Sequence, residues 1–147
     1  LPPFSYCSGK ANSCGGTPSI SSVGVSSATQ SAGFVLTGSN ARFAKSGLVI
    51  YTNNGPREPA VPFQGGLLCI NGPVRRGPAS IAQGGSQGQC NASFAMDMNG
   101  FAAGVGGGNP QGYLKIPGTA VDCQWWGRDT QANGSYLSDA LRYVVGP

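Results

Sequence analysis

The chain has 147 residues, nine basic and five acidic side chains, and a formal net charge of +4. The basic residues are spread along the sequence, without the dense stripe that nucleic-acid binding favours, and no apolar run approaches the roughly 20 residues of a membrane span. We therefore expect neither a nucleic-acid partner nor a membrane span. The length predicts one domain, residues 1–147, with one core.

The first residues, LPPFSYC, predict an extended N-terminal arm at positions 1–6. Two prolines favour an extended backbone, and an extended segment can pair with the edge of another molecule's sheet. Self-association through this arm is therefore one expectation, and the alternative is that the arm folds back on its own domain. The candidate arm residues are Leu1, Pro2, Pro3, Phe4 and Tyr6.

After the arm come seven strand-length runs, separated by spacers rich in Gly, Pro and Asn, which break helices and form turns. This pattern predicts an all-β fold, a single antiparallel β-sandwich of about seven or eight strands. Only SYLSDALRY could carry a helical turn. The runs in chain order are ISSVGV, GFVLTGSN, SGLVIYTN, GGLLCING, SFAMDMNGF, GTAVDCQWW and ALRYVV.

Five cysteines are present without a CxxC motif or any histidine, so disulfides are a better expectation than a zinc site. Sequence proximity favours Cys7 with Cys14, closing a small loop, and Cys69 with Cys90, flanking a Gly-rich excursion. These bridges indicate an oxidising compartment and a secreted, extracellular or cell-surface protein. Cys123 is left over.

Two runs, SFAMDMNGF and GTAVDCQWW, alternate with the period of a strand that has one buried face. In SFAMDMNGF, Phe94, Met96 and Met98 share the predicted buried face. In GTAVDCQWW, the odd-numbered residues from Val121 to Trp125 share the apolar face, and Asp122, Gln124 and Trp126 lie on the other. This places the unpaired Cys123 in the core. The predicted core positions are Phe94, Met96, Met98, Val121, Cys123 and Trp125.

The stretch CQWWGRD gathers residue types that suit a binding face. Trp126 and Tyr113 lie outside the predicted inward faces and could form a sugar-stacking platform, although aromatic residues in sandwiches more often belong to a core or an interface. Arg128 and Asp129 follow at the end of the predicted strand, where they would organise the next turn. These four residues are the candidates for a ligand or interface site.

Catalytic chemistry has little support in the sequence. The chain lacks histidine, the common general base and metal ligand. We therefore expect no catalytic residue, no metal and no cofactor, and a protein that is not an enzyme. A secreted hydrolase with two facing carboxylates stays open as a weaker alternative. The carboxylates are scattered along the chain at Glu58, Asp97, Asp122, Asp129 and Asp139.

Two resemblances bear on fold and location. LKIPGTAVDC resembles the L-x-P-G-T corner before strand F of fibronectin-type and other immunoglobulin-like sandwiches, with Val121 where those often carry tyrosine. SYCSGKANS, KSGLVIY, PFQGGLLCINGPVRR, QWWGRD and LSDALRYVVGP resemble a domain that recurs in large secreted bacterial proteins, chiefly of planctomycete type. That domain has no established enzymatic activity, so the resemblance implies an extracellular β-rich module. It typically carries a small residue where Cys123 stands.

Three functions remain for this sequence. The leading hypothesis is a non-enzymatic extracellular structural or adhesive module, with a surface filament as one form of assembly. Its partners would be copies of itself or other cell-surface components. The alternatives are a carbohydrate-binding module that uses the Trp126 face to bind a polysaccharide, and a secreted hydrolase.

Overall fold

The computed structural model describes residues 2–64, 66–129 and 134–147. Its described residues form eleven strands, one short α-helix and one 3-10 helix, so the predicted all-β class is confirmed. The elements are β1 (Phe4–Tyr6), β2 (Ser19–Gly24), β3 (Phe34–Ala41), β4 (Ser46–Thr52), β5 (Pro56–Phe63), β6 (Gly66–Ile70), β7 (Arg75–Arg76), β8 (Ser80–Ile81), β9 (Ala92–Asp97), α1 (Met98–Ala102), η1 (Gly112–Lys115), β10 (Ala120–Asp129) and β11 (Gly134–Val144).

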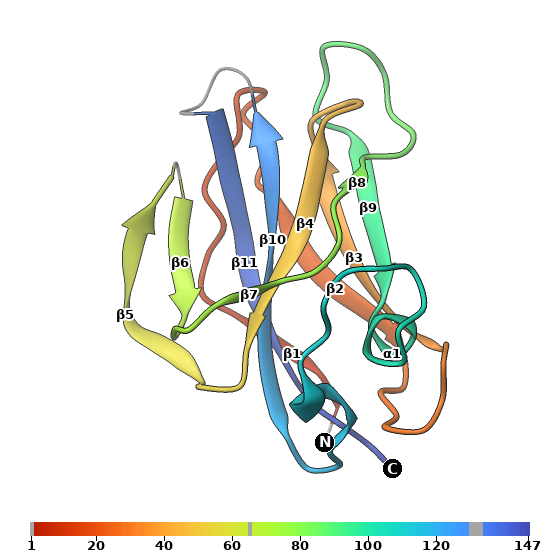
Figure 1. Ribbon diagram of the computed structural model, residues 1–147. Helices are drawn as coiled ribbons and strands as arrows, with labels where there is room; N and C mark the ends of the chain where they lie inside the picture. The colour runs from red at the N-terminus through yellow and green to blue at the C-terminus, as the bar shows by residue number, and fades with distance from the viewer. Residues whose placement is uncertain (1, 65, 130–133) are drawn as a thin grey trace.

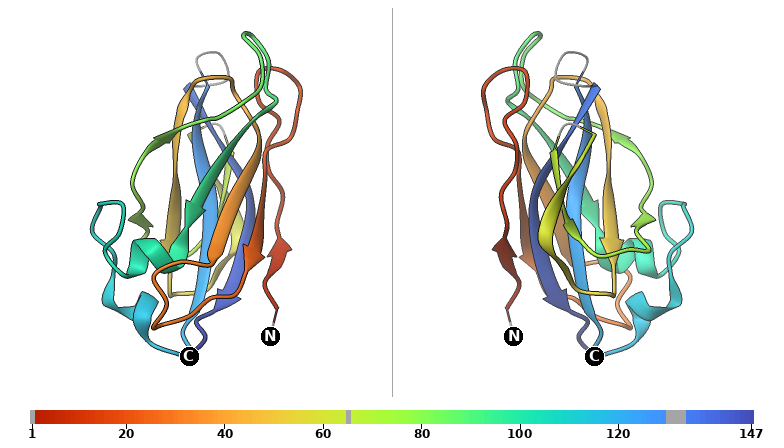
Figure 2. Two further views of the ribbon diagram at one scale, coloured as in Figure 1. Left: turned by 90° about the vertical axis from the view of Figure 1, so that its right-hand side faces the viewer. Right: turned by 90° about the vertical axis from the view of Figure 1, so that its left-hand side faces the viewer.

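The strands form three antiparallel sheets. A central sheet has the order β1-β11-β10-β4-β7, and β8 also pairs with β4. The sheet β2-β3-β9 packs on one face of it, and the β5-β6 hairpin lies over part of the opposite face (Figures 1 and 2). The antiparallel sandwich is therefore confirmed, with the hairpin as an additional layer, while an immunoglobulin-like topology stays a prediction.

All seven predicted runs contain strands, but the predicted count of seven or eight is too low for the described chain. The spacer NNGPREPAVP forms most of β5, and NGPVRRGPAS contains β7. Proline fits in β5 because this strand pairs with β6 alone and leaves its other edge unpaired, so a missing N–H costs no ladder hydrogen bond there. SYLSDALRY, the candidate helical turn, lies within β11.

The larger core lies between the central sheet and β2-β3-β9. Trp125 from β10 stacks on Phe94 from β9, with ring centroids 5.0 Å apart and planes 14° from parallel. Val121 and Cys123 are buried beside them, as predicted. Burial raises the pKa of the Cys123 thiol well above its ordinary value, so this free cysteine is a core residue held as the thiol.

The methionine prediction needs a correction. Met96 lies in β9 but is only partly buried, and Met98 is buried but begins α1 instead of continuing the strand. The strand ends because the Asp97 side chain accepts a hydrogen bond from the backbone N–H of Gly100, which caps a helical turn.

The second face of β10 is also buried, which the alternation of apolar and polar residues did not predict. Gln124 is fully buried beneath the β5-β6 hairpin. Its side chain accepts from the backbone N–H of Cys69 at 3.0 Å and donates to the carbonyls of Leu67 at 3.0 Å and Ser138 at 2.7 Å. Gln124 can be buried here because its hydrogen bonds to the protein take the place of the hydrogen bonds that its side chain would make to water.

A buried carboxylate on β10 binds both an arginine of β11 and a tyrosine of the N-terminal strand. The Asp122 carboxylate is fully buried and pairs with Arg142 at 2.9 Å, and the Tyr6 hydroxyl donates to the same carboxylate at 2.5 Å. Burial and this hydrogen bond raise the pKa of Tyr6 well above its ordinary value. In this single chain, β1 therefore pairs with β11, which is the fold-back alternative; Leu1 lies outside the described residues.

The predicted disulfide pairing is wrong. All four cysteines form bridges, but they join Cys7 to Cys69 and Cys14 to Cys90. The first bridge ties the end of β1 to the β5-β6 hairpin, and the second ties the N-terminal loop to the segment before β9. Proximity in sequence failed as a guide because the fold brings distant loops together.

None of the described helices has the length and hydropathy of a membrane-spanning helix.

Candidate functional site

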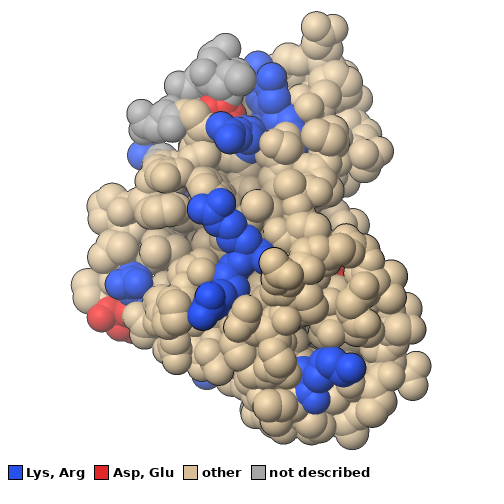
Figure 3. Space-filling model, in the orientation of Figure 1, with Lys and Arg blue, Asp and Glu red and all other residues tan. Residues whose placement is uncertain are grey.

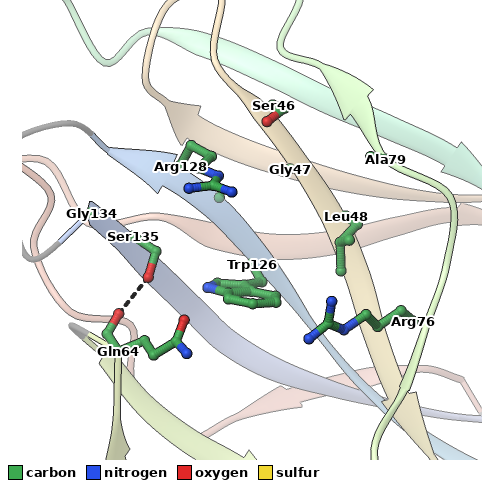
Figure 4. A pocket seen from close by; sticks show the side chains of 11 residues that line it. Ser46, Gly47, Leu48, Gln64, Arg76, Ala79, Trp126, Arg128, Gly134 and Ser135 are labelled. Carbon is green, nitrogen blue, oxygen red and sulfur yellow. Dashed lines mark hydrogen bonds between the residues drawn. The ribbon is translucent and has the colours of Figure 1, made fainter.

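A pocket opens on the face of the central sheet, beside the β5-β6 hairpin, with a volume of about 330 Å³ (Figure 4). Strands β4, β10 and β11 form its base, and segments on either side form its walls. We call this cavity the Trp126 pocket. Its lining residues are Ser46, Gly47, Leu48, Gln64, Arg76, Ala79, Trp126, Gly127, Arg128, Gly134 and Ser135.

Trp126 is the largest side chain in this pocket. Its indole is partly buried: the Phe63 ring lies 5.9 Å away, and the Arg76 guanidinium carbon lies 5.0 Å from the ring centroid. The indole Nε1 is buried and donates to no atom of the described structure. The ring is therefore not the bare sugar-stacking platform of the prediction, but it has an unused donor, and Figure 4 shows Nε1 directed toward the Gln64 and Ser135 side of the pocket.

The charge of the pocket is positive. Arg76 on β7 and Arg128 near the end of β10 are both exposed, and Figure 4 shows them on different sides of Trp126. No described lining residue is acidic. More broadly, lysine and arginine outnumber acidic side chains on this face of the molecule (Figure 3).

The far wall depends on the turn of the β5-β6 hairpin. Gln64 has φ of 41°, a left-handed conformation that is uncommon for a side-chain-bearing residue. The Ser135 hydroxyl donates to the Gln64 carbonyl at 2.6 Å and so joins this turn to β11. The Gln124 hydrogen bonds and the Cys7–Cys69 bridge hold the rest of the hairpin against the sheet. These contacts attach the wall to the central sheet.

The structure brings together two of the four predicted ligand residues, Trp126 and Arg128. Asp129 is buried and accepts from the backbone N–H of Ser13 at 2.7 Å, so it anchors the N-terminal loop. Tyr113 lies on η1 with its ring 6.1 Å from that of Tyr51, and burial raises its pKa to about 12. Neither Asp129 nor Tyr113 lines the Trp126 pocket.

Sequence reasoning missed Arg76, Gln64 and Ser135 as site residues. One signal was available, because Arg75 and Arg76 are adjacent in a chain with few charges. Their place in a Pro- and Gly-rich spacer concealed that a two-residue strand, β7, would hold Arg76 over Trp126.

Four of the five carboxylates make structural contacts. Asp97 accepts from Gly100, Asp122 pairs with Arg142, and Asp129 and Asp139 accept from backbone N–H groups of Ser13 and Ile20. Within residues 2–64, 66–129 and 134–147, no group of three or more His, Cys, Asp or Glu could hold a metal ion.

No family model, no curated protein and no solved structure matches this chain. The resemblance to secreted planctomycete-type domains therefore stays a prediction from the sequence. The chemistry of the Trp126 pocket is the observation from which function has to be argued.

Proposed function

We propose that this protein is a non-enzymatic extracellular adhesive module that binds polysaccharide through the Trp126 pocket. The observation that carries the proposal is a preformed pocket in which an indole with an unused N–H donor lies among arginine and amide side chains. Saccharides present many oxygen acceptors for such donors. The rigid sandwich and its hairpin provide the support that a binding site needs.

An extracellular location is supported by the two disulfides, since such bridges persist in oxidising compartments. A binding role is favoured over hydrolysis because four carboxylates hold the fold together. The fifth, Glu58 on β5, is absent from the pocket lining. A glycosidase needs two carboxyl groups facing one cleft, and the described pocket lining offers none.

The test is retention of the disulfide-bonded protein on a panel of plant, algal and bacterial polysaccharides. We expect binding to at least one of them, accompanied by a change in tryptophan fluorescence, and roughly tenfold weaker binding for Trp126→Ala, a loss of about 1.4 kcal/mol. Because Trp126 is partly buried, a second variant, Ala79→Leu, narrows the pocket from an exposed position without touching the core.

Ala79→Leu should weaken binding while leaving the free energy of unfolding unchanged. Val105→Ser, at an exposed position outside the pocket, is the control. The proposal fails if no polysaccharide is retained, or if both pocket variants bind as the parent protein does.

A filament protomer is a second candidate, favoured by apolar side chains around the N-terminal strand. Phe4, Val23 and Val25 are 55%, 68% and 76% exposed. Beside them lies a groove of about 390 Å³ whose lining includes Pro2, Pro3 and Val25. The outer edge of β1 has no partner strand in the described chain, so a second copy could pair there.

Removing residues 1–6 is expected to abolish polymerisation, because it deletes both the edge strand and the exposed Phe4. Electron microscopy and sedimentation velocity measure this, and peptide mapping of the Cys14–Cys90 bridge shows whether the shortened chain still folds. Filaments that persist after the deletion, or an intact protein that stays monomeric at high concentration, would remove this candidate.

A further inference from the structure

We infer that the Trp126 pocket selects acidic saccharides, recognising a carboxylate or a sulfate ester with Arg76 and Arg128. This inference rests on the proposed function, and it adds the charge of the ligand, which the proposed function leaves open. It follows from the balance of donors, acceptors and charge in the pocket.

Among the side chains that line the pocket, donor N–H and O–H groups outnumber acceptor oxygens, which are the Gln64 amide oxygen and the hydroxyls of Ser46 and Ser135. The guanidinium groups, the Gln64 amide and the free Trp126 Nε1–H can all donate. The Ser135 hydroxyl already donates to the Gln64 carbonyl, which leaves its oxygen lone pairs as acceptors at the base. A neutral sugar hydroxyl both donates and accepts, whereas a carboxylate or sulfate only accepts. The lining therefore matches an anionic group better than a neutral one.

Within the part of the chain that the structure describes, neither pocket arginine belongs to the recorded ion pair, and Asp129, which follows Arg128, is buried and accepts from the backbone N–H of Ser13. Among the described residues the recorded ion pair joins Arg142 to Asp122, and neither residue lines the pocket. Two guanidinium groups around one cavity raise its positive potential and attract an anion. Arginine also binds carboxylate and sulfate with two parallel hydrogen bonds, so the recognition is geometric as well as electrostatic.

Arg76 is oriented for this role before a ligand arrives. Its guanidinium lies over the indole of Trp126, where the cation–π contact restricts a side chain that would otherwise be free on a two-residue strand. Less side-chain entropy is then lost on binding. Arg75, the preceding residue, does not line the pocket, because successive residues of a strand point to opposite faces.

An acidic polysaccharide is favoured over an anionic membrane by the shape of the site. The charge converges on one pocket of about 330 Å³ with an aromatic ring at its base, which suits a sugar residue carrying one acidic group. Vesicles containing phosphatidylglycerol serve as the membrane arm of the test.

The experiment compares glycans with similar backbones and different charge. Polygalacturonate is compared with its neutral methyl ester, and carboxymethyl cellulose with neutral hydroxyethyl cellulose. Heparin is compared with its desulfated, N-acetylated form, which keeps its carboxylates and therefore tests the sulfate groups. We expect at least one acidic member to bind at least tenfold more tightly than its partner, and its affinity to fall as salt increases.

Arg76→Gln and Arg128→Gln should each weaken acidic binding by roughly tenfold, the scale of one charge-assisted hydrogen bond. Arg75→Gln removes the same charge next to the pocket and should have less than a threefold effect. If Arg75→Gln weakens binding as much as Arg76→Gln, the attraction is diffuse and the inference is wrong.

The outcomes separate the inference from the proposed function. Equal binding of the more and the less charged member of every pair, lost in Trp126→Ala, overturns the charge selectivity and leaves polysaccharide binding standing. Binding to the anionic vesicles but to no glycan overturns both. An absence of binding to every glycan and vesicle also overturns both.

Discussion

Replacing Cys7 and Cys69 together by alanine is expected to lower the free energy of unfolding by about 4 kcal/mol. The two residues are 62 positions apart, so the bridge restricts a long loop of the unfolded chain. The bridge also ties β1 to the hairpin that forms a wall of the Trp126 pocket. Its removal should therefore lower the affinity for glycans as well as the free energy of unfolding. Chemical denaturation monitored by circular dichroism measures the loss.

The same measurement distinguishes the observed pairing from the local one. Under the local pairing, replacing Cys7 and Cys69 would break both bridges, Cys7–Cys14 and Cys69–Cys90, and would cost more, about 5.5 kcal/mol. Replacing Cys14 and Cys90, which are 76 positions apart, should cost as much as replacing the first pair. Peptide mapping under non-reducing conditions is the direct control, and a recovered Cys7–Cys14 peptide would contradict the structure.

Trp125→Ala is expected to destabilise the protein by about 3 to 5 kcal/mol, because it removes the largest fully buried side chain and leaves a cavity. The ring stacks on Phe94 at the centre of the larger core, and the Trp125 indole N–H has no hydrogen-bond partner in the described structure. Its contribution is therefore packing, and no polar contact is lost in the substitution. Thermal and chemical unfolding both measure the effect.

Trp125→Phe is the matched control. It keeps an aromatic ring against Phe94, so its free energy of unfolding should fall clearly less than that of Trp125→Ala. Cys123→Ala changes the same face of β10 by a small volume. We expect it to lower the free energy of unfolding only mildly. A Trp125→Ala variant as stable as the parent protein would contradict the buried position of this ring.

The neighbouring tryptophans of CQWWGRD thus have separate roles. Trp125 belongs to the core between two sheets, and Trp126 lies on the opposite face, where it forms the base of the pocket. A single extra residue on β11 opposite this point shifts the register of the β10-β11 pair, and the Ser138 hydroxyl accepts from the Trp125 backbone N–H there.

Much of the local structure follows from the sequence. Alternation and turn residues predicted seven of the strands and the burial of Val121, Cys123 and Trp125, because these patterns depend on neighbours a few positions away. The same reasoning missed β5, β7 and β8, which lie wholly or partly in segments that are typical of spacers. These strands exist because partner strands supply their hydrogen bonds.

The candidate site could be predicted only in part. Trp126 and Arg128 were identified from their residue types, but nothing in the sequence places Arg76, fifty positions earlier, over the same indole. Asp129 looked equally suitable as a ligand residue and is instead buried against the N-terminal loop. Residue type indicates what a side chain can bind, whereas the fold decides whether it faces solvent.

The sequence was sufficient to predict the all-β class, the positions of the main strands, the participation of four cysteines in disulfides and the one cysteine left unpaired. The pairing of the cysteines, the face of β10 that the hairpin covers and the basic residues that meet at Trp126 became known from the packed fold alone. The two groups of features differ in the sequence separation of the residues that produce them. Strand formation is set by local periodicity and turn chemistry, whereas disulfides, covered faces and pockets join segments tens of residues apart, and their geometry exists only after the sheets have packed.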